Sequence, residues 1–393
     1  MMTPSSDPRL PGGEALSEGF SLLELLVAMT IFLIISSVSF TLFSRHQAVL
    51  GEEQLTVGLN IGLRNALAQI QLDVANAGNG LILGPNVPAW PVGVTIINSN
   101  PTTSQCNPTA SYPPVYAAAC FDQLNVIIAD PNAPAIHPCA SSACTISTSA
   151  GTTANGLAPP VINPATGLLF TAAQVAAKFH AGDQVLFVQS CSGGGHAVGS
   201  SGCAFTTAVL ASAGATSTAA PGCNPAGCVS LTFNSTLAGG GNHTSNDPYN
   251  MTTNAPAGEL TDQFGQNDWV VHLLPINYSV NTNHTDSQNQ SDPQLMRTQG
   301  GTSIVLMDQV IAFKVGAALW NNSNTSTFQY NYDAATYSTP YQYNLIRSVR
   351  ASLIGRTEPN PTNPYRNPFD NGPYMIRGNS IIVDPRNLTM NND

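Results

Sequence analysis

The hydrophobic pattern begins with one long apolar run. Residues 20–43 read FSLLELLVAMTIFLIISSVSFTLF, and Glu24 is the only charged residue among them. At about 1.5 Å per residue, a helix of this length spans roughly 36 Å, enough to cross a hydrocarbon core of about 30 Å. The run is too long for the apolar region of a cleaved secretory signal, and Ser44-Arg45-His46 follows it instead of small residues. We therefore expect the segment to remain attached as a membrane anchor.

The pattern then becomes amphipathic. Apolar residues recur every three or four positions, at Leu55, Leu59, Leu63, Leu67, Ile70 and Val74, which is the spacing of one helix face. No proline occurs between Pro11 and Pro85, and residues 77–80 read Ala-Gly-Asn-Gly, a typical helix end. We predict one helix from Phe20 to near Asn76, roughly 57 residues and 85 Å long. Three glycines within it permit either bending or close backbone packing: Gly51, Gly58 and Gly62.

Beyond this helix the pattern changes to short runs with strand composition, separated by turn residues. These runs cover residues 121–129, 184–189, 229–233, 269–280, 303–315, 345–354 and 380–383. A helix followed by antiparallel strands is the α+β pattern. Residues from about 100 to 260 are rich in Ser, Thr, Ala, Gly, Asn and Pro and contain all eight cysteines. For this stretch we expect long loops with their own cross-links.

Composition narrows the class of protein. Only 9% of the 393 residues are charged, and 12 Lys and Arg stand against 22 Asp and Glu. So few cations make a groove that follows a phosphate backbone improbable, so we expect no nucleic-acid partner. A hydrophobic content of 42% is too high for a charge-driven disordered chain. The chain contains no G-x-S-x-G, Walker A or dinucleotide-binding pattern, so we expect a structural protein without a cofactor and not an enzyme.

The start of the apolar run carries a family resemblance. Residues 19–28, Gly-Phe-Ser-Leu-Leu-Glu-Leu-Leu-Val-Ala, resemble the class III signal of type IV pilins and type II secretion pseudopilins. The resemblance implies that a prepilin peptidase cuts between Gly19 and Phe20 and methylates the new amine of Phe20. Gly19 offers an unobstructed backbone to a protease cleft. Glu24, of this or a neighbouring subunit, then supplies the anion for the Phe20 ammonium; the alternative is that Glu24 snorkels to the membrane interface.

Four further segments resemble the PilW branch of minor pilins, and the two closing strands among them also resemble J-type pseudopilin domains. Residues 67–80 resemble its helix end, residues 308–315 and 346–357 its closing strands, and residues 381–388 its terminal strand. This implies a pilin-like α+β fold in which a long helix packs on an antiparallel β head. The corresponding domains are a leader (1–19), a transmembrane and assembly helix (20–77), and a β head (78–393) that holds the disulfide-bearing insertion.

The resemblance also implies a function and a location. We expect a structural minor pilin that is held in the bacterial inner membrane by one helix, with its head outside the cytoplasm, before it joins a pilus at the cell surface. Its partners would be the prepilin peptidase and methyltransferase, other minor and major pilins, the assembly platform and the lipid bilayer. Two alternatives are a J-type pseudopilin of a type II secretion system and a head that acts as a pilus-borne adhesin, for which loops on a scaffold are suited.

The cysteines indicate disulfides. An even number of cysteines in an exported domain favours cross-links, each worth about 2–4 kcal/mol. Neighbour pairing is the simplest of 105 connectivities, and it joins Cys106 to Cys120, Cys139 to Cys144, Cys191 to Cys203 and Cys223 to Cys228. The alternative is a zinc site whose four ligands are Cys139, Cys144, Cys223 and Cys228.

The acidic residues in Asn-rich segments are the remaining candidates for chemistry. Their carboxylates could hold Ca²⁺ through oxygen ligands, although no EF-hand order is present and solvated turns are the simpler interpretation. The candidates are Asp262, Asp268, Asp286 and Asp292. Histidines show no paired ligand spacing, so the sequence predicts no metal site built on them.

Overall fold

The computed structural model describes the chain in separate stretches, which are residues 21–79, 93–97, 118–141, 146–147, 153–157, 161–163, 166–188, 205–223, 227–233, 263–286, 290–319, 330–331, 346–359, 366–368 and 371–385. The chain divides into two compact units, Met1–Val57 and Gly58–Asp393. The predicted leader, with Gly19 and Phe20, lies outside the described residues.

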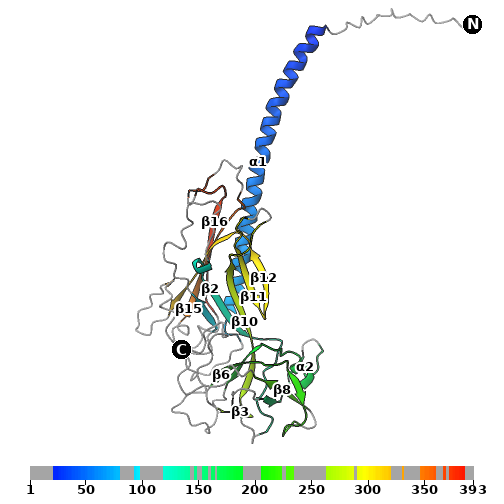
Figure 1. The fold of residues 1–393 in the computed structure, drawn as a ribbon, viewed down its shortest axis with the longest axis vertical. Coiled ribbons are helices and arrows are strands. Elements are labelled where there is room, and N and C mark those ends of the chain that lie inside the picture. Colours follow the sequence, from blue (N-terminus) through cyan, green and yellow to red (C-terminus); the bar gives the residue numbers. More distant parts are fainter. Residues whose placement is uncertain are drawn as a thin grey trace, which may run out of the picture. The chain divides into compact units, whose positions relative to one another are not determined.

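One helix, α1, runs from Leu22 to Ala75 and has 54 residues, which confirms the long N-terminal helix (Figure 1). It ends where the pattern predicted, because Gly78 adopts φ 73°, a left-handed conformation that glycine tolerates. The predicted apolar face is buried at five positions, Leu59, Leu63, Leu67, Ile70 and Val74. Leu55, which the spacing placed on the same face, is instead 45% exposed.

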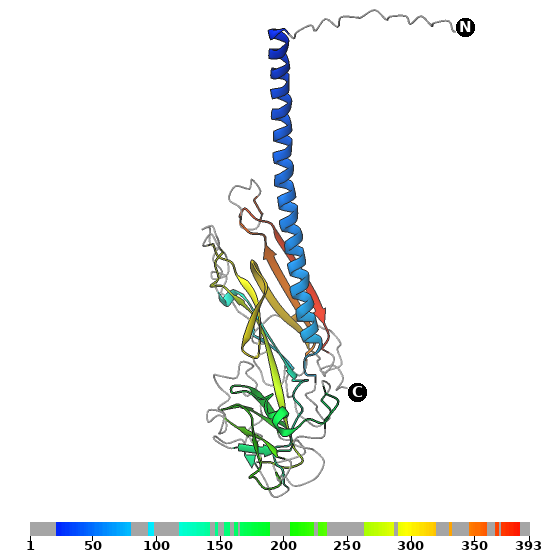
Figure 2. The ribbon, with the colours of Figure 1, turned by 90° about the vertical axis from the view of Figure 1, so that its right-hand side faces the viewer.

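In the second unit, the end of α1 packs against two antiparallel sheets. The first contains, in spatial order, β1 (Val94–Ile97), β2 (Gln123–Ala129), β10 (Trp269–Asn281), β11 (Gln294–Gln299) and β12 (Thr302–Met307). The second contains β14 (Tyr330–Asn331), β13 (Val310–Leu319), β15 (Ile346–Arg356) and β16 (Ile376–Val383). Leu63 of α1, Val126 of β2 and Phe313 of β13 belong to one buried cluster, the first core. Figure 2 shows strands of the head alongside the end of the helix. The α+β fold is therefore confirmed.

A second core lies within the stretch predicted to be loop-rich. Its residues come mainly from β4 (Thr153–Gly156), α2 (Ala172–Ala176), β5 (Gln184–Val188), β6 (Phe205–Val209), β8 (Cys228–Thr232) and β9 (Gln263–Phe264). Two short strands pair with these elements: β3 (Ile146–Ser147) with β9 and β7 (Ala215–Ser217) with β8. A single-turn helix, η1 (Ala118–Cys120), precedes β2. The ring of Phe187 packs against Phe233 and Phe264, with centroids 5.1 and 5.2 Å apart. The described parts of this stretch therefore include regular elements around buried aromatic residues.

Strand β10 is shared by the two cores. Its residues 269–272 pair with β5, and its residues 273–278 pair with β2. Figure 1 shows β10, in yellow-green, extending from the sheet with β2 and β11 to the region of β6 and β8. This strand is 13 residues long, so one continuous backbone contributes to both hydrophobic clusters.

Candidate functional site

The start of α1 is held by a reciprocal pair of hydrogen bonds between Ser21 and Glu24. Ser21 N donates to Glu24 Oε2 over 3.0 Å, and Glu24 N donates to Ser21 Oγ over 3.2 Å. This arrangement is a capping box, which satisfies backbone N–H groups that have no partner within the helix. The carboxylate also interacts favourably with the positive end of the helix dipole. Sequence reasoning missed this role of Ser21, although Ser-x-x-Glu before an apolar run is its signature.

The capping box is next to the predicted cleavage point in the sequence. Ser21 immediately follows Phe20, and consecutive Cα atoms lie about 3.8 Å apart. Gly19 and Phe20 themselves are not among the residues that the structure describes. The Glu24 carboxylate therefore accepts a hydrogen bond from the residue that directly follows residue 20. Cleavage after Gly19 would make residue 20 the new N-terminus.

The first unit presents an apolar helix surface. Leu22 is 81% exposed and Phe40 is 78% exposed, and an 18-residue window of α1 has a mean hydropathy of 2.4 with none of it buried. The hydroxyls of Thr30 and Thr41 donate to carbonyls of their own helix, over 2.8 and 2.9 Å, so these polar groups have partners without water. This part of α1 is long and apolar enough to cross a membrane.

The end of α1 is joined to the first sheet by the carboxylate of Asp73, which is 7% exposed. Arg297 Nε on β11 donates to Asp73 Oδ2 over 2.7 Å, and the Tyr278 hydroxyl on β10 donates to the same oxygen. Burial and the hydrogen bond to the Asp73 carboxylate raise the pKa of Tyr278, so this hydroxyl keeps its proton. Burial opposes the charge of Arg297, but its hydrogen bond to Asp73 raises the pKa of the guanidinium. The contacts hold α1 on β10 and β11.

The carboxylates considered for Ca²⁺ instead make bonds within the protein. Asp268 Oδ2 accepts from Gly265 N over 2.6 Å, and Asp286 Oδ1 accepts from Gln290 N over 2.8 Å. Asp292 accepts from His284 Nδ1 and from the backbone N–H of residue 309, both over 2.9 Å.

Two of these carboxylates are buried, although we expected all four to lie in solvated turns. Asp268 and Asp292 are only 4% and 6% exposed, so that interpretation was wrong for both. Asp262 lies outside the described residues. In the part of the chain that the structure describes, no three His, Cys, Asp or Glu side chains are grouped as metal ligands.

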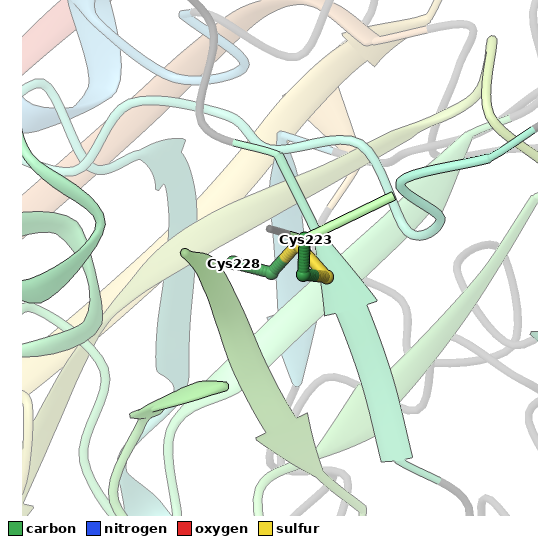
Figure 3. Close-up of a disulfide and its surroundings, with 2 residues drawn as sticks. All are labelled: Cys223 and Cys228. Carbon is green, nitrogen blue, oxygen red and sulfur yellow. A yellow bond between two sulfur atoms is a disulfide. The ribbon is translucent and has the colours of Figure 1, made fainter. Parts of the chain in front are cut away.

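One predicted cysteine pair is visible as a disulfide. Cys223 and Cys228 are joined, with their Cα atoms 5.1 Å apart (Figure 3), and they pack with Ala140 in a small buried cluster. Cys120 and Cys139 are also disulfide-bonded. The alternative of a zinc site with four cysteine ligands is therefore wrong, because Cys139, Cys223 and Cys228 have no free thiol. The remaining four cysteines lie outside the described residues: Cys106, Cys144, Cys191 and Cys203.

Comparisons with known proteins support the N-terminal motif. A model of the prokaryotic N-terminal methylation motif matches residues 16–40, which include Gly19, Phe20 and Glu24. No curated protein matches the chain. Among solved structures, the chain is similar to a type IV-like pilin from Thermus thermophilus, with 14% identity and a TM-score of 0.17. This match covers 30% of the present chain and 66% of that pilin, just under two thirds of its length.

The motif match identifies a prepilin-type N-terminal signal. Such a signal implies processing by a prepilin peptidase, and it lies at the start of a helix that is apolar enough to span a membrane. Together they point to a prepilin-like structural protein held by its N-terminal helix. Neither match separates a PilW-type minor pilin from a pseudopilin.

Proposed function

We propose that this chain is a structural minor pilin of the PilW type, which takes part in initiating a type IV pilus or in its tip complex. The observation that carries the proposal is the methylation motif at residues 16–40, placed at the start of a 54-residue helix whose first part is exposed and apolar. Before assembly, that apolar part anchors the chain in the inner membrane. After assembly, it packs with the helices of other pilins.

The proposal assigns a chemical role to each residue at the signal. A prepilin peptidase cuts between Gly19 and Phe20, so residues 1–19 leave as a leader and residues 20–77 and 78–393 remain as assembly helix and head. The cut creates an ammonium group on Phe20, which the enzyme then methylates. In an apolar environment this cation needs an anion, and Glu24 supplies one. The capping box supports this role because it already holds the Glu24 carboxylate at the start of the helix.

Processing is tested by mass spectrometry of the chain isolated from its host. We expect the native protein to begin at a methylated Phe20, and a Gly19→Val variant to accumulate as the full-length precursor because a branched side chain obstructs the protease cleft. A Gly13→Val variant, changed within the leader and away from the cut, serves as the matched control and should be processed normally. An intact N-terminus on the wild-type chain, or a cut beyond Phe43, would refute the proposal.

The role of Glu24 in assembly is tested by separating its charge from its capping bond. Glu24→Gln keeps an oxygen that can accept from Ser21 N, because glutamine also forms capping boxes, but it removes the charge. We expect both Glu24→Gln and Glu24→Ala to be cleaved and to enter sheared pili several-fold less than wild type. If Glu24→Gln enters pili normally while Glu24→Ala does not, Glu24 acts only as a cap and the charge pairing is excluded.

The same preparations distinguish a pilus from a secretion system. A minor pilin should co-purify with sheared pili, and its deletion should reduce the number of pili on the cell. A J-type pseudopilin would leave the pili unchanged, and its deletion would instead block export of secreted enzymes. The second result would replace the pilus role while keeping the processing at Gly19 and Phe20.

A further inference from the structure

The side chain of His272 lies between two carboxylates from different strands. His272 Nδ1 is 3.0 Å from Asp130 Oδ2, with which it is hydrogen-bonded, and His272 Nε2 is 3.0 Å from Asp183 Oδ2. The second contact brings the ring close to a carboxylate without a hydrogen bond, and it is an ion pair when the imidazole is protonated. The imidazole is only 5% exposed. Asp130 immediately follows β2 and Asp183 immediately precedes β5, so one buried ring contacts the ends of two strands.

This cluster, Asp130–His272–Asp183, lies at the boundary between the two cores. His272 pairs with Val185 of β5, whereas Leu273 pairs with Ala129 of β2. Leu273 belongs to the first core and Val185 to the second. Phe179, also of the second core, packs on the imidazole with ring centroids 5.1 Å apart. The His272 side chain therefore lies where the two hydrophobic clusters meet.

The two contacts require a charged imidazole. A neutral imidazole has one N–H donor and one lone-pair acceptor, whereas imidazolium donates from both nitrogens. Between two ionised carboxylates, a neutral ring satisfies only one of them and turns its lone pair towards the other. Because that second contact would be repulsive at 3.0 Å, loss of a single proton changes it from attraction to repulsion.

We propose that the Asp130–His272–Asp183 cluster is a pH-sensitive junction, which holds the second core on the first when His272 is protonated and weakens when it is neutral. Among the described residues, one further titratable group faces the cluster. His180 Nδ1 lies 3.3 Å from Asp183 Oδ2, but its side chain is 72% exposed. Asp183 also accepts from His180 N over 2.6 Å, so it stays fixed in its turn when His272 loses its charge.

The direction of the pH effect follows from the environment of the ring. Burial opposes the charge of His272, but the two neighbouring carboxylates, Asp183 and Asp130, outweigh it and raise the pKa of His272 above the ordinary 6.5. A raised histidine pKa contributes stability that is fully present below the unfolded value and is lost as the pH rises through the folded value. Burial alone would raise the pKa of Asp183. The neighbouring His272 ring and the hydrogen bond from His180 N outweigh burial and lower this pKa below 3.8. The junction is therefore intact below the ordinary histidine pKa and weakens as the pH rises through the raised pKa of His272.

Hydrogen–deuterium exchange of the full chain in detergent micelles tests this junction. Protection of peptides from α2, β5 and β6 is divided by protection of peptides from β13 and β15 in the same sample, so the intrinsic effect of pH on exchange largely cancels. We expect the ratio to fall several-fold as the pH is raised from 6 to 9. A ratio that stays constant or rises with pH would overturn the proposal.

Variants identify His272 as the titrating group. In Asp183→Asn the amide can donate to the lone pair of a neutral imidazole, so the contact survives deprotonation and the ratio should no longer fall. His272→Gln should likewise abolish the pH dependence. His180→Gln and His284→Gln are matched controls, and both should behave as wild type. His272 is not the titrating group if His180→Gln removes the pH dependence, or if Asp183→Asn leaves it unchanged. The result with Asp183→Asn remains decisive even if His272→Gln fails to fold.

Discussion

At the residue scale, single buried carboxylates connect segments that lie far apart in the sequence. Asp122 is 1% exposed and accepts from Lys314 Nζ over 2.9 Å and from Val315 N over 2.8 Å. Because Asp122 directly precedes β2, these bonds join the first sheet to β13 of the second. Asp73 plays the same part between α1 and the first sheet. A charge in such a place has to be paired, since an unpaired buried carboxylate is costly.

Replacing Asp73 by asparagine should therefore loosen α1 from the first sheet. The amide keeps one acceptor, but it leaves Arg297 without its counter-charge and turns a donor towards the Tyr278 hydroxyl. We expect the free energy of unfolding to fall by about 2 kcal/mol, the level for a hydrogen bond to a charged group. Chemical denaturation of the full chain in micelles measures this loss. Asp384→Asn, at an exposed carboxylate, is the control, and an equal effect of both variants would contradict the explanation.

These contacts show what the sequence could not predict at this scale. Asp73 and Tyr278 are separated by 205 positions, and Asp130 and His272 by 142. No spacing rule connects such residues, because the sheet pairing that brings them together is non-local. Ser21 and Glu24 differ in this respect: the capping box is local, and its pattern was present in the sequence.

At the scale of elements, continuous runs of β-branched and apolar residues predicted most of the long strands. The runs at 121–129, 184–189, 269–280 and 345–354 correspond to β2, β5, β10 and β15. These predictions succeeded because side chains of this kind suit a buried pleated surface.

One strand prediction is divided in the structure, and one strand of the first sheet was not predicted. The run at 303–315 is divided into β12 and β13 by Gln309, which adopts φ 55° while its N–H donates to Asp292. The strand β11, QLMRTQ, was missed because it has no β-branched alternation. Tertiary pairing with β10 and β12 determines it.

Replacement by alanine should have opposite effects at a glycine within α1 and at the glycine that directly precedes β1. A Cβ on Gly62 would lie 3.6 Å from Met307 Cγ, an ordinary contact, so Gly62→Ala should stabilise the helix by about 1 kcal/mol. A Cβ on Gly93 would lie 2.6 Å from Gly78 N, so Gly93→Ala should destabilise the chain by about 1–3 kcal/mol. Thermal or denaturant unfolding measures both effects. A loss of stability in Gly62→Ala would instead favour the close packing that the sequence left open.

At the scale of the whole chain, amino-acid composition predicted the loops of the stretch from about 100 to 260 but not its second core. Ser, Thr, Gly and Pro between about 100 and 260 predicted loops, and the cysteines predicted cross-links. The second core was not visible, because its buried aromatic and aliphatic residues are widely spaced among turn residues. Phe179, Phe187, Phe233 and Phe264 gather only after the strands have paired.

The Cys223–Cys228 disulfide should stabilise this second core locally. A chain-entropy estimate for so short a closed loop is about 2 kcal/mol. We expect the double variant Cys223→Ala with Cys228→Ala to lose hydrogen-exchange protection in β7 and β8, while β13 and β15 remain protected. Equal loss throughout the chain would show that the two cores unfold together and not separately.

The shared strand β10 determines how the head would carry a pulling force. If tension acts between the two cores along this strand, it passes through covalent backbone from Trp269 to Asn281. The neighbouring strands β2, β5 and β11 run antiparallel to it, so force in that direction loads their hydrogen bonds in shear, many at a time. Strand pairs whose hydrogen bonds are loaded together resist rupture better than pairs whose hydrogen bonds break one after another.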